Sequence, residues 1–206
     1  MMRGQGRYYL MAGWLMLVAL TSASVLTIGL SPLIYAGYSG LIPFYRTFSL
    51  DYSTVLRNYW VLYRYLIAPW QPVLEFPDFI SSAHGLQHFS EVRQLMWFLV
   101  LICFIAWLGL IKAYRIRKNF AQLYIKAALR QLQYSLMVIL GVAALFFDQA
   151  FILFHRVVFR NDFWLFDPMR DPIILILPQT LFLVFFLSIL ISYLAISRGL
   201  YRWLWR

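Results

Sequence analysis

The three histidines are the side chains of this sequence best suited to proton transfer, and all lie where polar segments meet long apolar runs. His84 and His88 precede an apolar run that begins near Leu95, and His155 directly follows another run. Histidine titrates near neutral pH, so two neutral imidazoles can take a proton from one group and supply one to another. We expect His88 and His155 to share a site, because a short connection joins the two runs. The structural alternative is that interfacial histidines only hydrogen-bond lipid head groups or loop carbonyls.

The spacing of His84 and His88, four residues apart, also suits zinc binding from one face of a helix. Gly85 lies between them and weakens a helix, and a third ligand would have to come from His155 or a carboxylate. We therefore predict no metal site and no cofactor. A bis-histidine haem or metal-binding membrane protein, with His88 and His155 as ligands, remains an alternative.

Five charged side chains near these histidines are candidates for binding substrate, orienting a ring or stabilising an oxyanion: Glu91, Arg93, Asp148, Arg160 and Asp162. Glu91 follows His88 by three residues and could orient its ring. Asp148 lies within an apolar run, where a carboxylate is either functional or paired with a partner on another helix. The two arginines could steady the charge of a tetrahedral intermediate, or bind a lipid head group.

Lipid is the solvent that positions these residues, because 63% of the 206 residues are hydrophobic and only 13% are charged. About 20 helical residues are needed to cross about 30 Å of hydrocarbon, and a helix satisfies its backbone there whereas an open strand does not. Four apolar stretches meet this length and are predicted as transmembrane helices: 8–35, 94–111, 131–154 and 173–197. We expect Pro178 to kink the fourth.

The distribution of charge predicts how these helices are oriented. Eleven basic residues and no acidic ones lie in three segments, 1–7, 112–130 and 198–206, whereas the segments 36–93 and 155–172 hold seven of each. The positive-inside rule then places both termini and the loop 112–130 in the cytoplasm. The net charge of +10 is this excess, which suits anionic lipid head groups and not nucleic acid.

The longer outer segment, 36–93, reads as a small helical cap. Asp51 and Ser53 can cap a helix that runs to Pro69 with apolar residues at helical spacing. We therefore predict an all-α integral membrane protein, a single membrane domain over 1–206, with four transmembrane helices, a small extracellular cap and its reactive groups at the outer face of the membrane.

Two blocks of the sequence resemble a known family. Residues 82–95 read SAHGLQHFSEVRQL, and residues 154–168 read FHRVVFRNDFWLFDP, continuing through 171–178 as DPIILILP. Together with the four predicted spans, these blocks resemble the lipoprotein intramolecular transacylases, small integral membrane proteins of Gram-positive bacteria. The histidine pair of that family corresponds here to His88 and His155, whereas His84 has no counterpart. The stretch 157–159 is less aromatic than the resemblance leads us to expect.

The resemblance implies an acyltransferase of the bacterial plasma membrane, whose partners are diacylated lipoproteins and membrane lipids. Such an enzyme moves the acyl chain at the sn-2 position of a diacylglyceryl-cysteine onto the α-amine of the same molecule, giving the lyso-form.

The residues fit this chemistry, because the amine must lose a proton and the glyceryl oxygen must gain one, and a histidine pair can do both. No serine lies in a nucleophile elbow. Positioning two reacting groups of one molecule supplies much of the reduction in the activation barrier. The sequence leaves open which histidine is the base. It also leaves open a non-catalytic membrane subunit whose polar cluster docks a partner.

Overall fold

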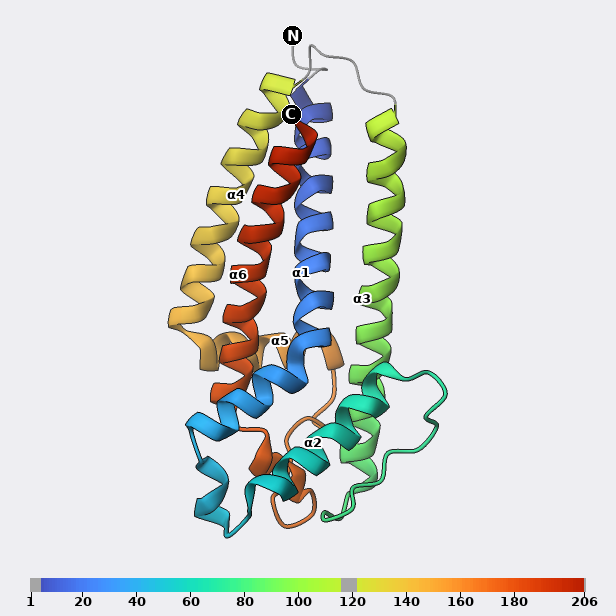
Figure 1. Cartoon of the computed structure of the whole chain (residues 1–206), viewed down its shortest axis with the longest axis vertical. Helices are drawn as coiled ribbons and strands as arrows, with labels where there is room; N and C mark the ends of the chain where they lie inside the picture. The colour runs from blue at the N-terminus through green and yellow to red at the C-terminus, as the bar shows by residue number, and fades with distance from the viewer. Residues whose placement is uncertain (1–4, 116–121, 206) are drawn as a thin grey trace. The chain divides into compact units, whose positions relative to one another are not determined.

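The computed structural model describes residues 5–115 and 122–205, which form helices and no strand. The α-helices are α1 (Gln5–Leu41), α2 (Tyr52–Ile67), α3 (Ala83–Arg115), α4 (Gln122–Leu145), α5 (Phe147–Phe159) and α6 (Gln179–Leu204), and the 3₁₀ helices are η2 (Phe44–Phe48) and η4 (Pro172–Ile176). Four of these, α1, α3, α4 and α6, are long and apolar enough to cross a membrane (Figure 1). The predicted all-α fold with four membrane-spanning helices is confirmed.

The third predicted span differs from the structure. Residues 131–154 were expected to form one helix, but α4 ends at Leu145 and α5 begins at Phe147. Asp148 lies in the first turn of α5, where a carboxylate is favoured by the partial positive charge of a helix N-terminus. The prediction that Asp148 lies inside a span is therefore wrong. Apolar residues continue through both helices, so hydropathy alone could not reveal the break.

The fourth predicted span begins later than expected. Residues 172–176 form η4, and α6 begins at Gln179, directly after Pro178. Proline has no amide hydrogen to donate, so it suits the residue ahead of a helix, and the predicted kink at Pro178 is wrong. The predicted loop 112–130 is shorter than expected, since α3 extends to Arg115 and α4 starts at Gln122. Four of the basic residues used for the orientation lie outside the described residues: Arg3, Arg117, Lys118 and Arg206.

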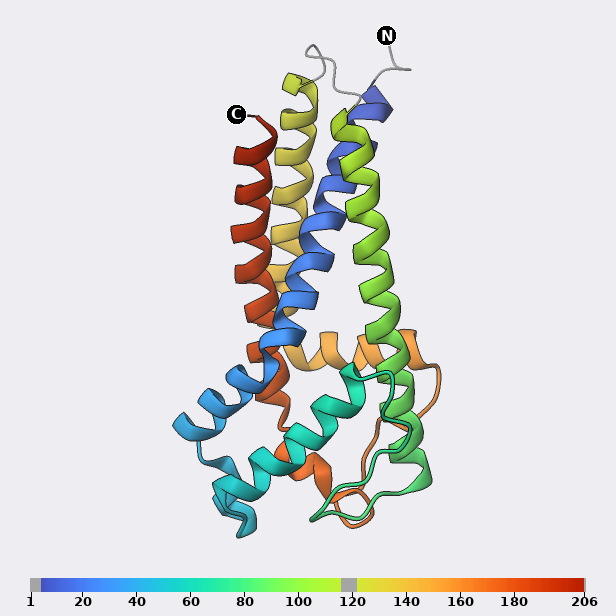
Figure 2. The same ribbon diagram turned by 45° about the vertical axis from the view of Figure 1, so that its right-hand side comes forward.

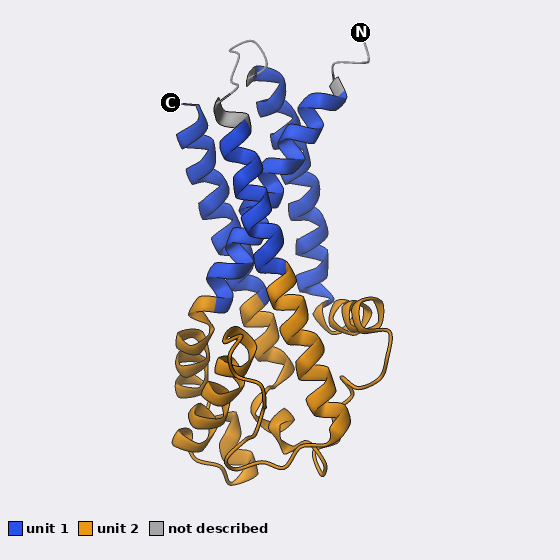
Figure 3. Cartoon of the chain, turned by 90° about the vertical axis from the view of Figure 1, so that its right-hand side faces the viewer, with its two compact units in different colours: residues 1–28, 99–146, 186–206 blue, residues 29–98, 147–185 orange. Residues whose placement is uncertain are grey.

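The chain divides into two compact units, shown in blue and orange in Figure 3. Unit 1 comprises residues 1–28, 99–146 and 186–206, in which the segments of α1, α3, α4 and α6 run side by side (Figures 1 and 2). One end of this unit holds the start of α1, the end of α3, the start of α4 and the end of α6 (Figure 1). That arrangement is expected of a chain that crosses a membrane an even number of times.

Close contacts between α1 and α3 hold unit 1 together. The indole nitrogen of Trp14 donates to the carbonyl of Ala106 at 2.9 Å, and that of Trp107 donates to the hydroxyl of Ser22 at 2.9 Å. A side chain at Gly109 would lie 2.4 Å from the Trp14 ring, so glycine is required where the ring crosses α3. Small residues at such positions let membrane helices approach one another.

Unit 2 comprises residues 29–98 and 147–185 and contains every candidate site residue named from the sequence. Its helix α2 begins as predicted, since the Asp51 carboxylate accepts a hydrogen bond from the Thr54 amide at 2.7 Å. The helix ends at Ile67, two residues before Pro69. Its buried face packs into an aromatic core, in which the rings of Tyr35 and Tyr59 stack with centroids 3.8 Å apart. A single membrane domain over both units stays a prediction.

Candidate active site

The structure brings His88 and His155 together in unit 2. His88 lies on α3 and His155 on α5, and their ring centroids are 5.9 Å apart. Both rings also contact Phe159, whose centroid is 4.7 Å from that of His88 and 5.5 Å from that of His155. The expectation that two histidines from different apolar runs meet at one place therefore agrees with the geometry.

His88 is enclosed by aromatic rings. Only 5% of the residue is exposed, and the rings of Phe89, Phe159 and Phe166 surround it with centroids at 6.0, 4.7 and 5.6 Å. Its Nδ1 atom is buried and has no hydrogen-bond partner within the part of the chain that the structure describes. A buried polar atom without a hydrogen-bond partner lowers the stability of the fold. Its presence here therefore favours a role for His88 in catalysis or binding.

His155 has a defined protonation state. Its Nδ1 lies 2.8 Å from the carbonyl oxygen of Phe151, and because a carbonyl can only accept, Nδ1 carries the hydrogen. Burial lowers the pKa of His155 below the usual value of an exposed histidine, and the hydrogen bond to Phe151 opposes this only in part. The ring is therefore neutral near pH 7, and its other nitrogen, Nε2, is left with a free lone pair.

The segment after α5 covers the histidines with aromatic side chains. Trp164 packs on His155 with ring centroids 4.9 Å apart, and Phe166 packs on His88. Asn161 anchors this segment, because its side-chain nitrogen donates to both Glu91 oxygens at 3.1 and 3.2 Å and its carbonyl accepts from the Trp164 indole at 2.8 Å. Asn161 thus ties the aromatic cover to α3.

A capping arrangement that sequence reasoning missed fixes the start of α3. The Asp171 carboxylate, 5% exposed, accepts hydrogen bonds at 2.7 Å from both the amide and the hydroxyl of Ser82. The same hydroxyl accepts from the Gly85 amide at 3.0 Å. In a capping box the acid would stand three residues after the serine, where this chain has Gly85. Here the carboxylate comes from 89 residues further along, and the absence of a side chain at Gly85 makes room for it.

The remaining predicted site residues lie elsewhere around this pair. The Arg93 guanidinium donates to the carbonyls of Gln71 and Ala68 at 2.7 and 2.8 Å and lies 4.7 Å from the centre of the Tyr65 ring. It therefore holds the end of α2 against α3. Arg160, Asp162 and Asp148 are exposed, and Arg160 ends α5 with a left-handed backbone, φ 53°.

His84 does not join the histidine pair. Its ring stacks on Phe163, with centroids 4.3 Å apart and planes 16° apart. Within residues 5–115 and 122–205, no three His, Cys, Asp or Glu side chains lie close enough together to hold a metal ion.

A pocket of about 340 Å³ opens beside the histidines. Four apolar side chains and two polar ones line it: Leu95, Phe98, Val158 and Phe159, with Glu91 and Gln94. Phe159 is both a wall of the pocket and a ring neighbour of the two histidines, so the pocket lies next to the pair. Such a site can receive an apolar chain and a polar group together, next to two proton-transfer groups.

Comparison with known proteins shows the family to which the chain belongs. The family model described as lipoprotein intramolecular transacylase matches residues 9–186. The chain belongs to this family. The protein is accordingly a membrane-integral, multi-pass acyltransferase, as the resemblance of residues 82–95 and 154–168 predicted. The alternatives of a bis-histidine haem or metal protein and of a non-catalytic subunit are not supported.

Solved structures of a transacylase of this family from Bacillus cereus are similar over nearly the whole chain. One has a TM-score of 0.73 and 25% identity, covering 97% of this chain and 95% of that one. Two variants of the same protein, with a histidine replaced by arginine or by alanine, each have a TM-score of 0.69 at 25% identity and 97% coverage of this chain, with 91% and 93% of theirs. A search of curated proteins found no match.

Proposed function

We propose that this transacylase moves the sn-2 acyl chain of a diacylglyceryl-cysteine lipoprotein onto that molecule's own N-terminal α-amine, with His88 and His155 as the acid–base pair. The observation that carries the proposal is the pairing of two imidazoles, with ring centroids 5.9 Å apart, among aromatic rings and beside a pocket lined by both apolar and polar side chains. The product is a lyso-form lipoprotein with one amide-linked and one ester-linked chain.

The two rings differ in a way that suggests separate roles. His155 donates its Nδ1 hydrogen to Phe151, so its Nε2 accepts the proton that the amine must lose before attack. His88 has a buried, unpartnered Nδ1, and a bare nitrogen there costs less than a buried N–H with nothing to donate to. We therefore assign its hydrogen to Nε2, from which it can donate to the departing glyceryl oxygen.

The reaction balances without any further reactant. The amine nitrogen attacks the ester carbonyl, the carbon–oxygen bond to glycerol breaks, and the proton taken from the amine ends on the glyceryl oxygen. The amine and the ester belong to one substrate, so holding them together supplies much of the barrier reduction. Exclusion of water by the aromatic rings around His88 and His155 also favours acyl transfer over hydrolysis.

We also propose that both termini are cytoplasmic and that the histidines lie at the outer face. The support is the charge asymmetry, since the segments 1–7, 112–130 and 198–206 carry eleven basic residues and no acidic ones. A reporter that works only in the cytoplasm should be active when it is fused after Arg206. A reporter that works only outside the cell should be active when it is inserted near Gln71. The reverse pattern would refute this orientation.

The experiment that tests the proposed function uses detergent-purified protein and one synthetic diacylated lipopeptide. We expect conversion to an N-acyl, monoacylglyceryl form with no change in total mass and no need for phospholipid. A lipopeptide with an acetylated amine should not react. A product heavier by one acyl chain, formed only when phospholipid is added, would show an intermolecular N-acyltransferase and refute the proposal even if both histidines were essential.

A further inference from the structure

Glu91 is a carboxylate with hydrogen-bond donors but no positive partner. Its oxygens accept from the side-chain nitrogens of Asn161, at 3.1 and 3.2 Å, and of Gln87, at 3.3 Å. Among the described residues it forms no ion pair, and it is partly buried. These amide donors fix the carboxylate in one place without neutralising its charge.

The carboxylate stands at the pocket beside the histidine pair. It lines that pocket with Gln94, and the other lining side chains are apolar. One wall, Phe159, contacts both histidine rings. The pocket therefore offers one negative charge against apolar walls, next to the groups that move protons. A ligand that fits it has an apolar chain and a cationic group close together.

The substrate of the proposed reaction has this combination, whereas the product does not. Its α-amine has a reference pKa of about 7.7–8.0, so much of it arrives as an ammonium ion beside the acyl chains. After transfer the same nitrogen is an uncharged amide. A carboxylate that binds the ammonium would thus hold the substrate and release the product.

We propose that Glu91 binds the α-ammonium group of the lipopeptide, held in position by Asn161 and Gln87, and that this contact makes the site prefer substrate over product. The inference rests on the proposed function. It makes Glu91 a substrate-binding residue, a role different from orienting the His88 ring, since its hydrogen bonds in the structure go to Asn161 and Gln87.

The test compares the affinities of two lipopeptides that differ only at the amine. One has a free amine and the other is N-acetylated, and both are measured on full-length His88→Ala protein in phosphatidylglycerol nanodiscs, so that no turnover occurs. Loss of a charged hydrogen bond costs about tenfold or more in affinity, so the free amine should bind at least about tenfold more tightly. Adding Glu91→Gln should bring the ratio close to one, because glutamine keeps an oxygen for Asn161 but loses the charge.

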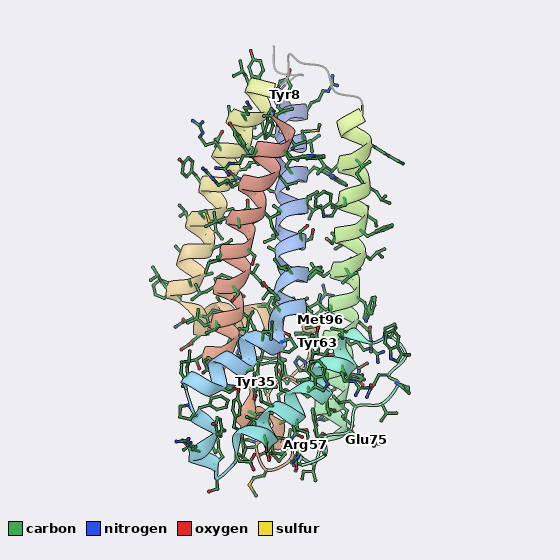
Figure 4. All side chains as sticks on the ribbon, viewed as in Figure 1. Tyr8, Tyr35, Arg57, Tyr63, Glu75 and Met96 are labelled. Atoms are coloured by element: carbon green, nitrogen blue, oxygen red, sulfur yellow. The ribbon has the colours of Figure 1, made fainter. Side chains whose placement is uncertain are left out.

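Two further variants serve as controls. Glu75→Gln removes the same charge from the exposed loop between α2 and α3 in unit 2 (Figure 4), and should leave the ratio unchanged. Glu91→Asp keeps the charge, and should retain most of the preference even if Glu91→Gln protein proves too unstable to measure. Loss of the preference in Glu91→Asp, or loss of it in Glu75→Gln, would overturn the proposal.

Two other results would also overturn it. One is a ratio that stays at its original value in folded Glu91→Gln protein. The other is equally strong competition by phosphatidylethanolamine, which presents a primary ammonium from a lipid head group, and would show a general head-group site. These outcomes are distinct from failure of the proposed function, in which the wild-type protein would not convert the free-amine lipopeptide at all.

Discussion

Replacing Gly85 by alanine should destabilise the protein and impair the site, whereas Gly→Ala inside a helix is usually stabilising. A Cβ at this position would lie 2.3 Å from an Asp171 carboxylate oxygen and 2.9 Å from both Asp171 Cγ and a Phe166 ring carbon. Neither neighbour is free to move, since Asp171 holds the amide and hydroxyl of Ser82 and Phe166 packs on His88 and Phe89. The added methyl group must therefore disturb the start of α3 or the aromatic cover.

The size of the effect follows from these contacts. Overpacking costs about 1–3 kcal/mol, and losing hydrogen bonds to a buried carboxylate costs about 1.5–3 kcal/mol. Alanine regains up to about 1 kcal/mol of helix propensity. The net expectation is a loss of about 1.5–6 kcal/mol, which at about 2–4 °C per kcal/mol lowers the midpoint of thermal unfolding by at least about 3 °C.

Thermal unfolding of the detergent-solubilised protein, followed together with transacylase activity, checks this prediction. The matched control is Gly37→Ala, an exposed helical position in the same unit where a Cβ meets nothing within 4 Å. That variant should be as stable as the wild type or slightly more so. If Gly85→Ala unfolds at the wild-type temperature and keeps full activity, the close approach of Asp171 to α3 is not what the structure indicates.

Three further results are expected. His88→Ala and His155→Ala should each lower lyso-lipoprotein formation by at least about 100-fold, while His84→Ala keeps most of the activity. Equal losses from all three variants would point to a metal cluster, and a chelator should then inactivate the wild-type enzyme. Burial lowers the pKa of His155, so its neutral form persists below pH 6.5. The acid limb of the pH–rate profile should therefore have a midpoint below about 6.5, with activity falling only as the pH drops through that midpoint. A midpoint above about 7 would contradict this. Arg93→Ala should lower the unfolding temperature and leave the rate per folded molecule little changed, because Arg93 binds two backbone carbonyls. A large loss of rate in fully stable protein would instead support a role for Arg93 in stabilising the oxyanion.

Local rules and hydropathy were sufficient for much of the fold. Asp51 caps α2 because its carboxylate and the Thr54 amide are three residues apart, a relation visible in the sequence. The four apolar helices follow from length and composition. The break at Phe146 could not be predicted this way, because apolar residues continue across it and neither glycine nor proline marks it.

The site was only partly predictable for a similar reason. The two histidines could be paired because each borders an apolar run, so that a similar depth in a membrane could be predicted for both before their contacts were known. The capping of α3 by Asp171 could not be predicted, since its partner Ser82 is 89 residues away in the sequence and no local spacing connects the two. Gly85 was the one available signal, but alone it suggested only a weakened helix. The two backbone carbonyls that accept from Arg93 could not be predicted either, because charge and closeness to His88 in the sequence do not reveal them.

The central claim is that the acyl chain passes from the sn-2 oxygen to the amine within one molecule, and a crossover experiment tests it most directly. Two diacylated lipopeptides with different peptide sequences are mixed in equal amounts with the purified protein, and only one of them carries a deuterated sn-2 chain. Tandem mass spectrometry then locates the deuterated chain in each product. The account predicts that the label lies on the amine of its own peptide and never on the other. Label on the unlabelled peptide, or retention of the label on glycerol while an undeuterated chain appears on the amine, would contradict it.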